Sequence, residues 1–285
     1  MSLDASIDAP LKSDRATGRP RVLALANQKG GVGKTTTAIN LGTALAAIGE
    51  RVLIVDLDPQ GNASTGLGIE PKDRRVSTYD VLVGDRTLAS AVHETAVPGL
   101  AIAPSTLDLL GLELEIANLK DRAHRLKMAI SALHVADVMA GQSPFTYILV
   151  DCPPSLNLLT INAMAAADAV LVPLQCEFFA LEGLSQLLKT VEQVRQSLNS
   201  TLSIHGIVLT MFDSRNNLCT QVVDDVRSFM GSKVYDTVIP RNVRVSEAPS
   251  YGKPVLLYDL KSTGAQAYLK LASEVIMRER QLQAA

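Results

Sequence analysis

Continuous apolar runs alternate with helical patterns along most of this chain. Several runs are built from Val, Ile, Leu and Ala without a polar residue, which is typical of strands covered on both faces. We expect strands at Val22–Ala26, Val52–Val55, Leu100–Ala103, Tyr147–Val150, Ala169–Pro173, Ile204–Thr210 and Val234–Ile239. Helices are expected at Thr35–Ile48, Leu107–His134, Leu156–Ala167, Leu181–Leu198, Cys219–Phe229 and Ala265–Gln281. The alternation predicts an α/β fold with a doubly wound, mostly parallel sheet and helices on both faces.

The 285 residues suit one large domain. Residues 1–20 mix Asp, Lys, Arg, Pro and Ser without periodicity, so we predict a disordered N-terminal tail there and a single domain over 21–285. Within that domain, residues 60–99 and 135–145 are the least regular, and the second of these segments is interpreted as a small insertion.

Composition narrows the possibilities further. Aromatic residues make up only 4% of the chain, so the core must consist mainly of aliphatic side chains. The net charge of −2 favours neither a nucleic acid nor a membrane partner. Cys152, Cys176 and Cys219 form no CxxC pair, so no zinc or redox site is indicated. An odd number of cysteines without a signal peptide indicates a reducing cytosol, so a cytoplasmic protein is expected. No apolar run reaches about 18 residues, so no transmembrane helix is expected.

The segment Lys29–Thr36 reads KGGVGKTT and follows directly on the first predicted strand. Its glycines let the backbone turn tightly and direct N–H groups into one concavity, which suits phosphate oxygens. The N-terminus of the following helix adds partial positive charge. Lys34 then supplies a cation for the β- and γ-phosphates, and Thr35 supplies a hydroxyl for Mg²⁺. The pattern predicts a phosphate-binding loop, and its nucleotide-binding candidates are Lys29, Gly30, Gly31, Val32, Gly33, Lys34, Thr35 and Thr36.

This loop departs from the usual phosphate-loop pattern in two ways. Gln28 occupies the position where a glycine is expected, and Lys29 places a second lysine inside the loop. A glycine-rich turn that binds nothing is the plainer interpretation, but the strand before the loop and the helix after it argue against it. A dinucleotide fingerprint fits less well, because its third glycine would fall on Thr36.

Two further carboxylate motifs follow predicted strands. The segment 56–62 reads DLDPQGN, and the segment 151–155 reads DCPPS. A carboxylate at a strand end can hold Mg²⁺ directly or through water, and Asp151 fits that role. Asp58 lies just beyond its strand, where it can orient or activate the attacking water, and it is also a candidate metal ligand. Asp-Pro alone is an ordinary turn signal. Together with Lys29 and Lys34, these two aspartates are the candidate catalytic residues.

At this point the chain resembles the ParA/Soj branch of the deviant Walker-A ATPases, which also include MinD. The resemblance runs from about Arg21 to about Glu274. It rests on six blocks in sequence, of which the last two indicate a chromosomal-type ParA rather than MinD: KGGVGKTT (29–36), DLDPQGNASTGLG (56–68), DCPPSLNLLTINA (151–163), QCEFFALEGLSQLL (175–188), LTMFDSRNNL (209–218) and IPRNVRVSEAPSYGKPVLLYD (239–259).

The resemblance implies a P-loop fold and a reaction cycle driven by Mg–ATP. In this family ATP joins two subunits into a sandwich dimer, and the signature lysine, here Lys29, reaches the phosphates of the other subunit. Thr36 would contact the α-phosphate and Asp58 would be required for hydrolysis. Pro240 and Asn242 match the segment that contacts adenine.

The resemblance also implies partners. Arg215 and Arg244 match residues that contact DNA in relatives, and Arg241, Lys233 and Lys253 are weaker candidates. For either arginine alone, a solvated surface charge is the plainer interpretation. Contacts to phosphate would make binding to double-stranded DNA non-specific and salt-sensitive, and duplication in a dimer would strengthen it. A ParB-type partner would stimulate hydrolysis and release the protein from the nucleoid.

Other functions stay open at this stage. A positioning ATPase of the same fold could move a protein cargo along DNA, and no residue separates it from a DNA-segregation ATPase. A MinD-like protein would need a basic amphipathic membrane helix at its end, whereas residues 268–280 indicate a helix packed on the core, so no membrane partner is expected. A metal-carrier or metabolic enzyme would need cysteine pairs or a further substrate pocket.

Overall fold

The computed structural model describes residues 18–284, and the predicted tail lies largely outside them. Eight strands form one sheet in the order β3-β4-β2-β5-β1-β6-β7-β8. Every pairing is parallel except that of β3 with β4. The strands are β1 (Arg21–Leu25), β2 (Val52–Asp56), β3 (His93–Glu94), β4 (Leu100–Ala103), β5 (Tyr147–Asp151), β6 (Ala169–Gln175), β7 (Ser203–Phe212) and β8 (Val234–Pro240). All seven predicted strands are confirmed to within two residues at each end.

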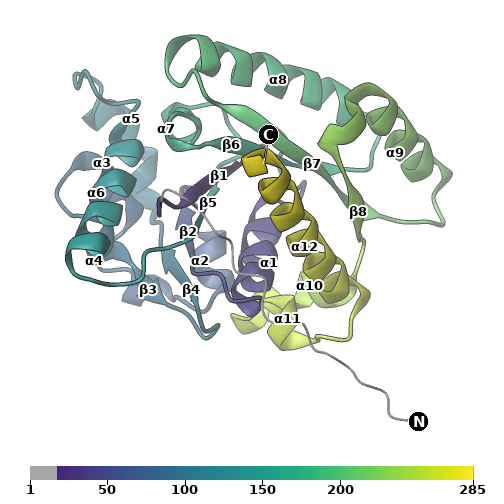
Figure 1. Ribbon diagram of the computed structural model, residues 1–285, viewed down its shortest axis with the longest axis horizontal. Coiled ribbons are helices and arrows are strands. Elements are labelled where there is room, and N and C mark those ends of the chain that lie inside the picture. Colours follow the sequence, from purple (N-terminus) through teal and green to yellow (C-terminus); the bar gives the residue numbers. More distant parts are fainter. Residues whose placement is uncertain (1–17, 285) are drawn as a thin grey trace.

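Helices cover both faces of the sheet, which confirms the doubly wound α/β prediction (Figure 1). They are α1 (Lys34–Ala47), α2 (Asn62–Gly66), α3 (Thr78–Val83), α4 (Leu88–Ala91), α5 (Leu112–Glu115), α6 (Arg125–Met139), α7 (Leu158–Ala166), α8 (Ala180–Ser197), α9 (Asn217–Met230), α10 (Val243–Glu247), α11 (Val255–Tyr258) and α12 (Thr263–Ala284). Short 3-10 turns lie at η1 (Pro71–Asp73), η2 (Leu107–Leu110), η3 (Gly231–Lys233) and η4 (Ala248–Tyr251).

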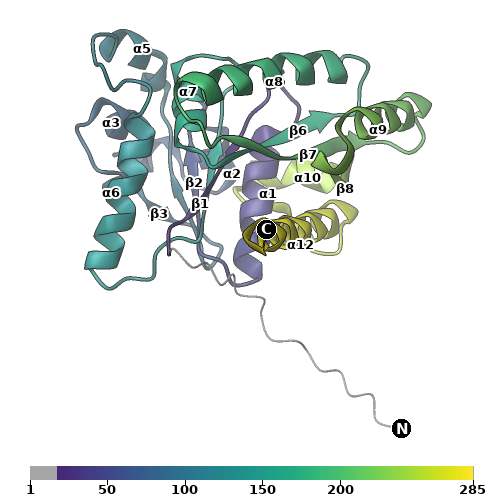
Figure 2. The same cartoon turned by 45° about the horizontal axis from the view of Figure 1, so that its top comes forward.

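The apolar strands are continuous because their two faces enter two different cores. Along β1, Leu23 and Leu25 pack with α1 and α12, whereas Val22 and Ala24 belong to the core on the α6–α9 side. Alternate residues of a strand point to opposite faces, so a strand that is covered twice must be apolar at every position. Figures 1 and 2 both show α12 lying beside α1 across one face, and residue contacts between the two helices agree.

The predicted helix Leu107–His134 is wrong as one element. The chain forms η2 and α5, turns between 116 and 124, and begins α6 at Arg125. Gly111 separates η2 from α5 and lowers helix propensity there. The Arg125 side chain donates to the backbone carbonyls of Leu82 (2.8 Å) and Val83 (2.9 Å). These bonds join residues more than 40 positions apart and fix where α6 starts, so the local apolar pattern could not predict that boundary.

The interpretation of 135–145 as an irregular insertion is also wrong in its first half. Helix α6 continues to Met139. Gly141 then adopts φ +65°, the left-handed conformation that glycine tolerates best after a helix end. The irregular segment 60–99 likewise contains α2, α3, α4 and β3, each too short to show a clear periodicity. The predicted division into a tail over 1–20 and one domain over 21–285 stays a prediction.

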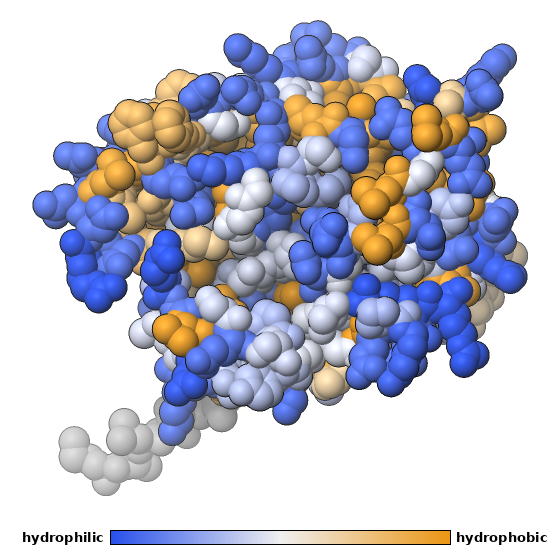
Figure 3. Space-filling view, turned by 180° about the vertical axis from the view of Figure 1, so that it is seen from behind, coloured by the Kyte–Doolittle hydropathy of each residue, from blue (hydrophilic) through white to orange (hydrophobic). Residues whose placement is uncertain are grey.

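The face seen from behind is mainly hydrophilic, with separate hydrophobic groups (Figure 3). Scattered apolar side chains of this kind are normal on a protein surface. No helix within residues 18–284 is both long enough and apolar enough to cross a membrane.

Candidate nucleotide site at the carboxyl edge of the sheet

The glycine-rich loop joins β1, in the middle of the sheet, to the N-terminus of α1. Gly31 and Gly33 have φ values of +75° and +88°, a region in which a side chain would be strained. Gly33 precedes the first residue of α1, and no side chain caps the first N–H groups of that helix. A loop of this shape therefore presents backbone donors and the positive end of a helix toward the carboxyl edge of the sheet.

Neighbouring strands hold the loop in place. Asn27 donates from Nδ2 to the carbonyl of Pro173 on β6 (2.8 Å) and accepts from the N–H of Lys29 (3.1 Å). The hydroxyl of Thr210 on β7 donates to the carbonyl of Val32 (2.8 Å). Asn27 and Thr210 are both buried. The loop is thus fixed from two strands before any ligand arrives.

Lys34 lies buried beneath this loop, with 6% of its surface exposed. Its Nζ donates to the carbonyl of Lys29 (3.0 Å). Burial lowers the pKa of the Lys34 ammonium, and the nearby Asp151, Cys152 and Asp58 oppose that shift. The carboxylates around it thus favour the charged form that a phosphate ligand requires.

Two buried carboxylates stand side by side under the loop. Asp56 and Asp151 end the adjacent strands β2 and β5 and are partners in register. Both are fully buried, and burial raises the pKa of each, that of Asp56 to about 6. Asp56 accepts hydrogen bonds from the N–H of Ser64 (3.0 Å), the hydroxyl of Ser64 (2.7 Å) and the N–H of Asp58 (3.2 Å).

Asp151 differs from Asp56 in its hydrogen bonding. Its two carboxylate oxygens are buried and have no hydrogen-bond partner of normal geometry among residues 18–284. The hydroxyl of Thr35 is close enough to lower the pKa of Asp151, but burial outweighs it. A buried carboxylate with free lone pairs beside a threonine hydroxyl offers the hard oxygen ligands that Mg²⁺ prefers. These two residues therefore fit a magnesium ion.

Asp58 lies on the loop beyond β2 and is half-buried. Its carboxylate accepts from the N–H of Gln60 (3.0 Å), and its carbonyl accepts from the hydroxyl of Ser105. The N–H of Ser105 in turn donates to the Ser64 hydroxyl (3.2 Å), so one chain of bonds connects Asp58 to Asp56 through Ser105 and Ser64. The Asp58 carboxylate lies close enough to Lys34 to favour its charged form and so raise its pKa, and a residue that orients a water at the γ-phosphate would have to lie in this region.

The side chain of Lys29 leaves the loop on the outside and is 44% exposed. It forms an ion pair with Glu177, which follows the end of β6. The sequence reasoning missed Glu177, although it lies in one of the blocks that carry the family resemblance. No local signal marks it, because 148 residues separate the two partners.

Pro240 and Asn242 lie where β8 ends. Pro240 is paired in register with Phe212 of β7, and Asn242 caps α10 by accepting from the N–H of Val245 (3.3 Å). The amide of Asn242 also donates to the hydroxyl of Thr263 at the start of α12 (2.9 Å). These bonds connect the segment to α10 and α12, and a role of Pro240 and Asn242 toward adenine stays a prediction.

The predicted DNA-binding arginines fall into two groups, Arg215 with Arg241 and Arg244 by itself. The N–H of Arg241 donates to the carbonyl of Phe212 (2.9 Å), which brings Arg241 next to the loop that carries Arg215. Arg215 is 86% exposed and bonds Asp213, whose pKa is lowered to about 2 by Arg215 first and by Arg241 in addition. Arg244 lies on α10 and pairs with Glu247 (3.1 Å) and Asp259 (3.5 Å).

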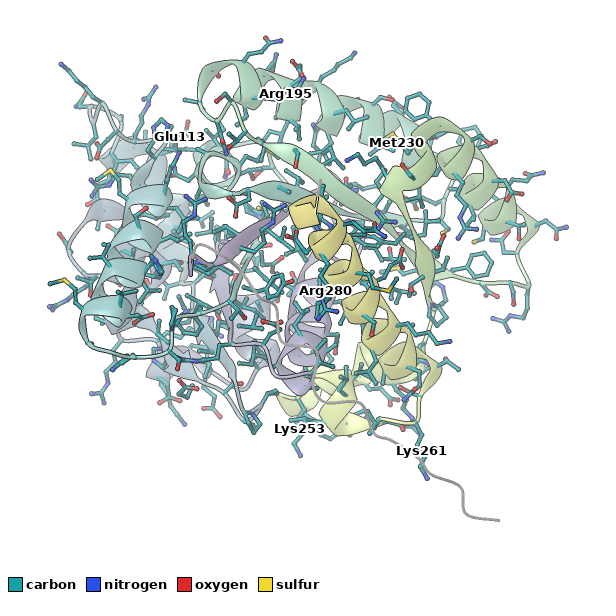
Figure 4. All side chains as sticks on the ribbon, in the orientation of Figure 1. Glu113, Arg195, Met230, Lys253, Lys261 and Arg280 are labelled. Atoms are coloured by element: carbon teal, nitrogen blue, oxygen red, sulfur yellow. The ribbon has the colours of Figure 1, made fainter. Side chains whose placement is uncertain are left out.

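The two lysines that were weaker candidates for DNA binding lie in different parts of the structure. Lys233 immediately precedes β8, at the amino end of that strand, and donates to the carbonyl of Ile204 (3.0 Å). Seven residues of strand, or about 20 Å, lie between it and Arg241. Lys253 donates from its N–H to the carbonyl of Ala248 in η4, and Figure 4 shows it at the end of the molecule formed by α11. The structure thus gathers Arg215 and Arg241 and leaves Lys233 apart.

Comparison with known proteins gives this edge of the sheet its context. Residues 20–204 match the family described as an AAA domain. The chain is 64% identical over 264 residues to the chromosome partitioning protein ParA of Caulobacter vibrioides, covering 93% of this chain and 97% of that protein. It is 53% identical to the sporulation initiation inhibitor protein Soj of Bacillus subtilis, covering 90% and 98%. The chain belongs to the ParA/Soj family of chromosome-partitioning ATPases.

Solved structures support the same ATPase fold for this ParA/Soj member. A cobyrinic acid a,c-diamide synthase from Mycobacterium smegmatis, with bound ADP and magnesium, is 38% identical, with a TM-score of 0.77 over 92% of this chain and 96% of that one. The cell division ATPase MinD of Pyrococcus furiosus is 28% identical, with a TM-score of 0.72 over 90% and 98%. These structures confirm the predicted fold, and the two partition proteins above confirm the sequence resemblance to the ParA/Soj branch.

The bond from Thr210 to Val32 can be tested on its own. Thr210→Val keeps the shape of the side chain but leaves the buried carbonyl of Val32 without its donor, which should lower the free energy of unfolding by about 1–3 kcal/mol. Thr190→Val on α8 is the matched control: its hydroxyl bonds the carbonyl of Gln186 at the surface, and its loss should change the free energy of unfolding by less than about 0.5 kcal/mol. Urea denaturation of both variants measures the difference; equal stabilities would mean that the bond does not hold the loop.

Proposed function

We propose that this chain is an ATP-driven DNA-segregation switch. With Mg–ATP bound, two copies join face to face and hold DNA without regard to its sequence. A ParB-type partner stimulates hydrolysis, after which the subunits separate and leave the nucleoid. The observation that supports this most directly is the pair of lysines in one loop. Lys34 is buried beneath the loop, and the side chain of Lys29 is half-exposed and lies on the outside of the loop.

Within one subunit, the loop residues bind and orient the nucleotide. The N–H groups of Gly30 to Thr36 face the phosphates, with Lys34 at the β/γ bridge. Thr35 and Asp151 would hold Mg²⁺, which neutralises charge on the phosphate oxygens when it is bound. Asp58 orients the attacking water or accepts its proton, and the bonds through Ser105 and Ser64 keep it in place.

Between subunits, Lys29 performs a different task. Two triphosphates that face each other repel, and each needs cations beyond those of its own loop. Lys29 is positioned to supply one to the partner, because its backbone is fixed and its side chain reaches into solvent. Dimerisation then depends on the γ-phosphate and ends when it is lost.

DNA binding would follow from doubling an exposed basic surface. Arg215, Arg241 and Arg244 form that surface in one subunit. Each contact would be made to a backbone phosphate, which for Arg215 and Arg244 would replace the carboxylates that they now pair with. Two linked surfaces bind far more strongly than one, so ATP can control affinity without any reading of bases.

A metabolic synthase is the alternative that a specific observation favours, because three of the similar solved structures carry that name. Its identity of 38% lies well below the 64% and 53% of the partition proteins. A DNA titration with ATP, with ADP and with no nucleotide discriminates: a synthase would bind no DNA in any of the three states. A positioning ATPase with a protein cargo would still bind DNA with ATP and differs only in its partner.

Lys34→Ala should weaken ATP binding by at least about 100-fold. The variant loses a charge-assisted hydrogen bond, worth about 3 kcal/mol, and about 1.4 kcal/mol corresponds to each tenfold. Calorimetry with ATP measures the affinity. Normal affinity in a folded variant would remove the basis for the phosphate-loop assignment.

Asp58→Ala should bind ATP normally and accumulate as a dimer, because attack by water is impaired while nucleotide contacts remain. We expect at least about a 100-fold lower turnover, the typical effect of losing a general base. Phosphate release and size-exclusion chromatography measure the two properties. Turnover at the parental rate would show that Asp58 is not the hydrolytic residue.

Arg215→Glu or Arg244→Glu should retain ATP-dependent dimerisation and lose DNA affinity by at least about tenfold. Each lost phosphate contact should reduce the slope of log affinity against log salt by about 0.9, and a dimer loses two. Arg195→Glu is the control, since Arg195 lies in the last turn of α8, at the opposite end of that helix from the segment that follows β6. Fluorescence anisotropy at several salt concentrations measures the effect; unchanged affinity in both test variants would place the surface elsewhere.

A further inference from the structure

The exposed loop lysine is already paired within its own chain. Lys29 binds Glu177, in the short segment between β6 and α8. The side chain of Glu177 is 29% exposed and that of Lys29 is 44% exposed. An ion pair this accessible to water is weak and exchanges readily. The lysine that the proposed dimer requires therefore has an alternative partner in every free subunit.

The backbone on both sides of the pair is fixed. The N–H of Lys29 donates to Asn27 (3.1 Å), and its carbonyl accepts from Lys34 (3.0 Å). The N–H of Glu177 donates to the carbonyl of Gln175 (2.9 Å), and the carbonyl of Glu177 accepts from the N–H of Ala180 (3.0 Å). The two side chains are both partly exposed, so Lys29 can exchange its partner without a rearrangement of these backbone segments.

From this geometry we propose that Glu177 is a positioning residue for Lys29, and that it sets how much ATP-bound protein is needed before two copies join. This inference rests on the proposed sandwich dimer. In the free subunit, Glu177 holds the ammonium of Lys29 beside the loop. In the dimer, the ammonium moves to the triphosphate of the second copy, whose negative charge exceeds that of one carboxylate.

The surroundings of the pair favour this exchange. Phe178 and Phe179 follow Glu177 and are 74% and 59% exposed, with ring centroids 5.1 Å apart. A second copy that covers these rings would remove water from around Lys29. Charge interactions strengthen as the effective dielectric constant falls, and the multiply charged phosphate gains more than the single carboxylate does.

Both subunits must break their ion pair when the dimer forms, so Glu177 affects the dimer Kd once for each subunit. An exposed pair shifts an equilibrium by roughly threefold. Removing it from both copies should therefore lower the dimer Kd by roughly tenfold. The nucleotide affinity of the monomer should not change, because Lys29 does not reach the phosphates of its own subunit in this scheme.

The experiment is sedimentation velocity of the full chain with Mg²⁺ and a non-hydrolysable ATP analogue, over a range of protein concentrations. We expect Glu177→Gln to dimerise with a Kd roughly tenfold below that of the parent. Glu177→Ala removes the same charge by a different substitution and should behave alike. Glu177→Asp retains the charge and should restore the parental Kd. Glu182→Gln, on the exposed first turn of α8, is the matched control and should leave it unchanged.

The outcomes separate the two proposals. Lys29→Ala is measured alongside and should abolish the dimer. If the parent dimerises, Lys29→Ala does not, and both charge-removing variants of Glu177 dimerise as the parent does or more weakly, Glu177 has no restraining role and this inference is overturned alone. If the parent itself remains a monomer with the analogue, the sandwich dimer is refuted and this inference with it.

Discussion

The structure depends on how one buried ammonium is compensated. Lys34 is almost fully enclosed, and an isolated charge in such a place would be costly. Parallel strands end at the same edge, so Asp151 and Asp58 approach Lys34 from β5 and from the loop after β2. The same topology places a second buried carboxylate, Asp56 at the end of β2, beside Asp151 at the end of β5, and these two negative charges repel each other. A bound cation would offset the repulsion between the carboxylates, and an anionic phosphate would offset the buried charge of Lys34.

This arrangement explains why much of the fold was predictable from the sequence. A central strand such as β1 contributes to two cores, so its apolar run is unambiguous. Helix α1 begins where the glycine loop ends, which the sequence also marks. The prediction of a single helix over residues 107–134 is wrong because the leucines there suggest one amphipathic helix. Its real boundaries depend on Arg125 binding carbonyls more than 40 residues away, which no local pattern records.

Some residues of the candidate site could be predicted from the sequence, and others could not. Residues that meet the ligand through the loop itself, such as Lys34 and Thr35, are contiguous and were predictable. Residues that hold the loop are distant in sequence: Thr210 reaches Val32 across 178 positions, and Glu177 reaches Lys29 across 148. A threonine within a strand and a glutamate before a helix carry no distinctive signal. Only the three-dimensional structure assigns them a partner.

A reversible switch constrains the strength of its own contacts. If Lys29 were buried in a strong intrachain pair, ATP could not recruit it, and if it had no partner, copies would join at lower protein concentrations. A half-exposed pair with Glu177 lies between these limits, because its free energy is comparable to the thermal energy. The arginines after β7 and β8 follow the same logic, since Arg215 and Arg244 are each held by a neighbouring carboxylate that a phosphate can replace. The chain thus keeps the cations that partners would need loosely occupied, so that each binding event is an exchange of one anion for another. Such exchanges have small net free energies, so in the proposed cycle the loss of one γ-phosphate would be enough to reverse them.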